Sequence, residues 1–179
     1  MEPDEIHRII ERCPYDFTKE DVPNPEMEIK IYSLIHKTPA MLWIERWKSE
    51  PPESLRYDSA IQTRECDTCA MTWIKHCKCD VPLYLRHDPN IQNAWGETCA
   101  MLWIAYCKSE PPEYLRHDSA IQDDYGDTCA IYWIKNCKCD VPLYLRHNPN
   151  IQNSNRSTCE ILWRICVSDK VPQYLRNNI

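Results

Sequence analysis

The chain has 179 residues, with 27 acidic against 21 basic side chains, and its formal net charge is −6. This balance argues against nucleic acid or an anionic membrane as the general partner, because both need a basic surface that neutralises phosphate. A mean hydropathy of −0.61, with no run of about 18 apolar residues, also excludes a membrane span.

Two residue counts narrow the function further. Only 2 glycines stand against 14 prolines, which argues against the glycine-rich loops that bind phosphates and dinucleotides. The 12 cysteines would suit a small disulfide-rich secreted protein, but the acidic start from Met1 to Glu5 does not resemble a secretory signal. We therefore expect free thiols and a cytoplasmic protein.

The first 37 residues differ from the rest of the chain. The stretch from Asp4 to Arg12 has the spacing of an amphipathic helix, and Met27 to His36 predicts a second one. Residues 1–37 are expected to form an N-terminal helical cap.

A repeat of 30 residues governs the chain from Thr38 onward, and a threonine opens each copy. The pattern predicts repeat 1 at 38–67, repeat 2 at 68–97, repeat 3 at 98–127, repeat 4 at 128–157 and a truncated C-terminal capping repeat at 158–179. Alternate repeats are the most alike, because SEPPE in one kind is replaced by CDVPL in the other. This alternation indicates that a pair of repeats was duplicated.

Each repeat predicts two helices and a loop. Its threonine, which an acidic residue precedes in repeats 2, 3 and 4, supplies a helix N-cap. One apolar helical face then follows at the spacing i, i+3, i+4 and i+7, formed in repeat 3 by Ala100, Trp103, Ile104 and Cys107. A proline begins a second, shorter helix. Because so small a pair cannot bury its apolar face alone, the repeats must stack, and we expect an all-α helical repeat solenoid.

The loop and helix from Asp88 to Ile104 resemble an ankyrin repeat. The matching residues are Asp88 and Asn90 at the start of the loop, Gly96 and Thr98 at its end, and Leu115 in the outer helix. The chain is similar to divergent, shortened ankyrin-like arrays of protist type. The resemblance implies stacked helix–turn–helix units and a non-enzymatic scaffold that binds a partner protein through loop tips and the inner-helix face.

The sequence also departs from the ankyrin pattern. Cys-Ala-Met replaces Pro-Leu-His after the threonine, and no glycine lies between the two helices. A helical solenoid of another kind therefore stays an alternative for the fold.

The cysteines allow a second hypothesis, a metal-binding or thiol-redox protein. Cys77 with Cys79, and Cys137 with Cys139, are Cys-x-Cys pairs that could bind zinc or copper(I). Serine replaces the second cysteine in alternate repeats, so buried apolar thiols are the favoured interpretation, with no metal or other cofactor. A third hypothesis is a designed or consensus-like repeat protein without a native partner.

The remaining polar residues fit a scaffold better than an enzyme. Cys107 and His117 could form a nucleophile and base, but both belong to repeating positions and no known catalytic motif is present. His87, His117 and His147 suit the C-terminal end of a helix dipole. The recurring arginines are expected to connect neighbouring repeats by pairing with Asp58, Asp88 or Asp118.

Variation between repeats marks the candidate binding surface, because recurring positions hold the scaffold. It concentrates at the loop tips and on one side of the first helix, away from the tryptophans. The predicted partner-binding residues are Arg64, Thr72, His76, Trp95, Tyr106, Tyr125, Tyr132, Asn136 and Asn155. The aromatic members are the expected anchors, since aromatic side chains dominate interface hot spots.

Overall fold

A computed structural model describes residues 37–56 and 61–176. The chain divides into two compact units, unit 1 from Met1 to His87 and unit 2 from Asp88 to Ile179, which are described separately below. The expected N-terminal cap, apart from Lys37, lies outside the described residues.

In the described residues, both units consist of short α-helices, each followed by a single turn of 3₁₀ helix. Unit 1 contains α3 (Pro39–Trp47), η1 (Glu53–Leu55), α4 (Cys69–Cys77) and η2 (Leu83–Leu85). Unit 2 contains α5 (Cys99–Cys107), η3 (Glu113–Leu115), α6 (Cys129–Asn136), η4 (Leu143–Leu145), α7 (Cys159–Cys166) and η5 (Gln173–Leu175). Among the described residues, no helix is both long and apolar enough to cross a bilayer.

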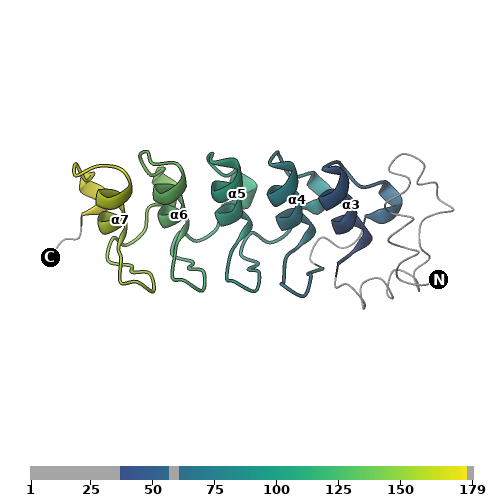
Figure 1. Ribbon diagram of the computed structural model, residues 1–179, viewed down its shortest axis with the longest axis horizontal. Coiled ribbons are helices and arrows are strands. Elements are labelled where there is room, and N and C mark those ends of the chain that lie inside the picture. Colours follow the sequence, from purple (N-terminus) through teal and green to yellow (C-terminus); the bar gives the residue numbers. More distant parts are fainter. Residues whose placement is uncertain (1–36, 57–60, 177–179) are drawn as a thin grey trace. The chain divides into compact units, whose positions relative to one another are not determined.

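Successive helices pack against each other. In unit 1, α3 packs on α4; in unit 2, α5 packs on α6 and α6 on α7. The three helices of unit 2 stand side by side in chain order, with the loop before each extending to the same side (Figure 1). This confirms the expected fold class, an all-α solenoid of stacked repeats, in which a single turn of 3₁₀ helix takes the place of the expected second helix. The exact repeat boundaries stay a prediction.

The ends of the helices follow from local sequence. Thr98 has an extended backbone, and its Oγ1 accepts a hydrogen bond from Met101 N at 3.3 Å, which begins α5 as predicted. At the other end Lys108 adopts the left-handed conformation with φ +52°, and Lys138 does so at +54° after α6. Lysine thus occupies a conformation that glycine usually supplies at a helix end.

In α5, the first helix of repeat 3, more residues are buried than the predicted apolar face contains. In α5 the six residues from Cys99 to Ile104 are all buried, whereas Cys107, the last member of the predicted face, is only half-buried. The reason is clearest in α6, which lies between α5 and α7 and is covered on two sides. The helical spacing of apolar residues predicts only one buried face. It therefore predicts fewer buried residues than a helix with neighbours on two sides has.

Arginine connects consecutive repeats through tyrosine rings. In unit 2, Arg116 Cζ lies 3.9 Å from the ring centroid of Tyr144, and Arg146 Cζ lies 3.5 Å from that of Tyr174. The ion pair of Arg116 is with Glu110, at 3.5 Å. Arg116 was expected to pair with Asp118, and this prediction was wrong. The Asp118 carboxylate instead accepts a hydrogen bond from Ala120 N.

The other two aspartates expected to pair with arginine have different outcomes. Asp88 Oδ1 accepts a hydrogen bond from Asn90 N at 2.9 Å and organises its own loop. Asp58 lies outside the described residues.

Candidate functional site

The loops before the helices of unit 2 form three fingers: finger 1 (residues 91–98), finger 2 (121–128) and finger 3 (151–158). Isolated β-bridges close finger 1 between Gln92 and Thr98, and finger 2 between Gln122 and Thr128. In finger 3, Asn153 N donates to Ser157 O at 3.1 Å. The fingers are therefore short hairpin-like loops with defined backbones.

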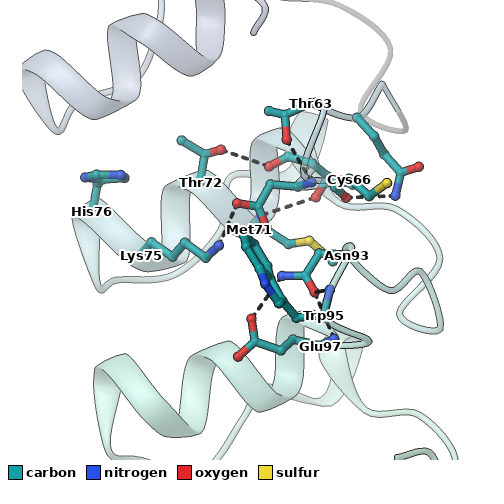
Figure 2. Close-up of polar contacts among 12 residues, drawn as sticks. Thr63, Cys66, Met71, Thr72, Lys75, His76, Asn93, Trp95 and Glu97 are labelled. Carbon is teal, nitrogen blue, oxygen red and sulfur yellow. Dashed lines mark hydrogen bonds and ion pairs between the residues drawn. The ribbon is translucent and has the colours of Figure 1, made fainter. Parts of the chain in front are cut away.

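A buried polar side chain organises the tip of each finger. Asn93 Oδ1 accepts hydrogen bonds from Trp95 N at 3.0 Å and Glu97 N at 2.9 Å, as Figure 2 shows. Asp123 makes the same pair of contacts in finger 2. Both residues lie in loops that vary between repeats, yet their side chains are buried. They shape the loop and leave the exposed surface to the residues that follow.

Hydrogen bonds join neighbouring fingers into a row. Asp124 N donates to Trp95 O at 2.9 Å, and Ser154 N donates to Tyr125 O at 2.7 Å. Gly96 fits this contact because its φ is +75° and a Cβ there would lie 2.8 Å from Asp123 Cα. The relative positions of the three tips are thus fixed by main-chain contacts.

Glutamine side chains add a second set of contacts between the fingers. Gln92 Nε2 donates to Gln122 O, and Gln122 Nε2 donates to Gln152 O, both at 3.0 Å. Each amide also donates to its own finger, at Gly96 O and Gly126 O respectively. A glutamine recurs at this position in every complete loop of the sequence, and in fingers 1 and 2 it has this structural role.

The predicted binding residues differ in exposure. Trp95, Tyr106 and Tyr125 expose 43%, 42% and 66% of their surface, large values for aromatic side chains. Arg64 and Asn155, which lie at loop tips, are also exposed. These five side chains are open to solvent in their own units.

Thr72 does not belong to this surface. It is 4% exposed, and its hydroxyl donates to Thr68 O at 3.1 Å. Leu102, at the same position of α5, is also buried. The position was expected to face solvent because it lies away from the tryptophans, but stacking covers more than one side of the helix.

The remaining three predicted residues are half-buried. His76 Nε2 lies 3.9 Å from Glu45 Oε1, and burial is the main reason why its pKa is lowered. Figure 2 shows His76 and Lys75 near the end of α4. Asn136 Nδ2 donates to Tyr132 O at 2.8 Å. These side chains can contribute polar edges to a binding surface.

Tyr132 forms the centre of an acidic cluster beneath the fingers. Its Oη lies 3.0 Å from Glu97 Oε1 and 2.9 Å from Asp123 Oδ2. Burial, followed by the two carboxylates, raises the pKa of Tyr132, and burial raises that of Asp123. Asn93 Nδ2 also donates to Glu97 Oε2 at 3.0 Å, and backbone N–H groups donate to Asp123. All these donors are neutral, so the hydrogen bonds satisfy the carboxylates without neutralising their charge.

The histidine that was considered as a base contacts a different cysteine. His117 Nε2 lies 2.7 Å from Thr98 Oγ1 and 3.4 Å from Cys129 Sγ. Cys129 is buried, and burial raises the pKa of its thiol to about 12. A thiol with that pKa stays protonated at neutral pH and is a poor nucleophile.

The Cys-x-Cys pairs have a similar limitation. Cys79 and Cys139 are exposed, whereas their partners in the pairs, Cys77 and Cys137, are half-buried. Burial raises the pKa of Cys77 to about 11 and also raises the pKa of Cys137. Metal binding needs deprotonated thiols, and a raised pKa opposes it. Within residues 37–56 and 61–176, no group of three or more His, Cys, Asp and Glu side chains is arranged to hold a metal ion.

Comparison with known proteins supports the fold. No family model and no curated protein matches the chain. Among solved structures it is similar to a crystal structure of the ankyrin repeat protein EF0377, with 13% sequence identity and a TM-score of 0.51. The match covers 92% of this chain and 86% of that one. The chain therefore has an ankyrin-like fold.

Proposed function

We propose that the chain is a non-enzymatic scaffold that binds a partner protein through the finger tips and the outward side of its inner helices. The observation that carries the proposal is the row of tips in unit 2, where neighbouring main chains are hydrogen-bonded and the side chains of Trp95 and Tyr125 are exposed. The partner is a protein of unknown identity.

A fixed row of tips is suited to binding because little conformational entropy is lost when a partner docks. Exposed aromatic side chains provide large contact areas and few rotatable bonds. The proposed contact residues are now Arg64, His76, Trp95, Tyr106, Tyr125, Tyr132, Asn136 and Asn155, without the buried Thr72.

The charge of the chain bears on the class of partner. A net charge of −6 opposes binding to phosphate backbones, so nucleic acid and anionic membrane are not proposed as partners. A cytoplasmic location and the lack of a cofactor remain predictions from the sequence.

The test is affinity capture from a native lysate with quantitative mass spectrometry. The parent chain is compared with a tip variant that carries Trp95→Ala and Tyr125→Ala. Leu143→Ala is the matched control, because Leu143 is 78% exposed and lies in η4, outside the fingers. Circular dichroism first establishes that all three proteins fold alike.

The proposal predicts a protein that the parent and the control retain and the tip variant loses. Identical protein lists for the parent and the tip variant would contradict a binding role for the fingers.

A further inference from the structure

The tips of fingers 1 and 2 combine exposed aromatic rings with an exposed acid. Trp95 and Tyr125 occupy corresponding positions of neighbouring fingers, and the hydrogen bond from Asp124 N to Trp95 O holds the tips in contact. Asp124 precedes Tyr125 in the chain and its side chain is exposed. Two partly exposed aromatic side chains and an exposed carboxylate thus lie on neighbouring finger tips.

Negative charge also predominates beneath these tips. Glu97 and Asp123 share the single hydroxyl of Tyr132, and Asp127 is paired with Lys135. With Asp124, four carboxyl groups lie on fingers 1 and 2, and Lys135 is the cation whose ion pair joins them. The local field therefore favours a cation and disfavours an anion.

We propose that fingers 1 and 2 bind a basic segment of the partner protein, with a lysine or arginine side chain placed on the exposed ring of Tyr125 and against Asp124. Aromatic rings attract cations through their electron-rich faces, and a neighbouring carboxylate strengthens that attraction. An apolar segment would cover Asp124 without compensating its charge. An acidic segment would meet charge of its own sign. This inference rests on the proposed function and names the chemistry of the partner.

The experiment uses the full chain and a fluorescein-labelled peptide of alternating arginine and glycine. Fluorescence anisotropy measures the dissociation constant, and a peptide of alternating glutamate and glycine is titrated in parallel. The basic peptide is expected to bind, with an affinity that falls as ionic strength rises, while the acidic peptide does not bind.

Matched variants separate a local site from the general negative charge of the protein. Asp124→Asn is expected to weaken binding of the basic peptide about fivefold, because it removes the carboxylate of the proposed contact. Glu113→Gln changes the net charge equally at an exposed residue of η3, and we expect less than about a twofold effect. Tyr125→Ala should also weaken binding about fivefold, compared with little change for Leu143→Ala.

Two results would overturn the inference. Equal weakening by Asp124→Asn and Glu113→Gln would mean that net charge alone attracts the peptide. Failure of the basic peptide to bind the parent would mean that the tips recognise another chemistry. In either case the capture experiment still decides whether the fingers bind a protein, so the inference can fail while the proposed function stands.

Discussion

Val141 N donates a hydrogen bond to Tyr174 Oη at 2.9 Å and so connects two consecutive repeats of unit 2. Tyr144 holds the corresponding place one repeat earlier, but its hydroxyl is buried without a hydrogen-bond partner among the described residues. The residue that corresponds to Val141 is there Pro111, which has no N–H. The alternation of SEPPE and CDVPL therefore changes the hydrogen bonding between repeats.

The two tyrosines should respond oppositely to loss of the hydroxyl. Tyr174→Phe removes a made hydrogen bond and should lower the free energy of unfolding by about 1 kcal/mol. Tyr144→Phe removes a buried hydroxyl that lacks a partner, so it should be neutral or stabilising. Urea denaturation followed by circular dichroism measures both, and equal losses would contradict the assigned difference.

Lys108 offers a stabilising substitution. Its φ of +52° is unfavourable for any residue with a Cβ, so Lys108→Gly should raise the free energy of unfolding by about 0.5–1 kcal/mol, net of the greater freedom of glycine in the unfolded chain. Lys108→Ala keeps the Cβ and is the control. A gain in the alanine variant as large as that in the glycine variant would show that backbone strain is not the cause.

Gly126 should tolerate no side chain. Its φ is +74°, and a Cβ would lie 2.9 Å from Asn153 Cα in the next finger. Gly126→Ala is expected to cost about 1–3 kcal/mol and to speed amide hydrogen exchange at Ser154 N, which donates across the same contact. Exchange at Met101 N, in α5, serves as the internal reference and should change less.

His117 makes stability depend on pH. Its Nδ1 lies 2.7 Å from Asp118 O, a pure acceptor, so Nδ1 carries the proton and the neutral ring accepts from Thr98 through Nε2. Burial lowers the pKa of His117 below its ordinary 6.5. As pH falls through 6.5, this histidine binds protons more readily in the unfolded chain than in the folded chain, so the free energy of unfolding decreases.

The difference between two proteins isolates this effect. Between pH 7.5 and pH 5.5, the parent should lose more free energy of unfolding than His117→Gln, which has no titrating ring. Asp123 acts in the opposite sense at lower pH because its pKa is raised, so the comparison between the proteins is the informative quantity. Parallel pH dependences for the two proteins would contradict the assignment.

Local features of the fold could be predicted from the sequence, whereas features that depend on neighbours could not. The Thr98 cap of α5 depends on residues three positions apart, and the structure confirms it. The burial of Thr72 depends on stacking, which the spacing of one helix does not contain. The contact of His117 with Cys129 and the Arg–Tyr contacts between repeats likewise depend on neighbouring repeats.

In the candidate site, too, some features could be predicted from the sequence and others were missed. Exposure of Trp95 and Tyr125 agreed with their place at loop tips. The inward turn of Asn93 and Asp123 was missed, although the short polar side chains of Asn and Asp commonly bond the backbone two residues on and form such turns. That signal lay in the sequence, but variation between repeats obscured it.

The glutamine contacts that run from finger 1 to finger 3 have a consequence for how such a surface can change. Each amide bonds its own loop and the next one through main-chain oxygens. None of these bonds involves the side chains of Trp95, Tyr125 or Asn155. An exposed tip residue can therefore be exchanged without moving its neighbours, so the surface can acquire a new chemistry while it keeps its shape.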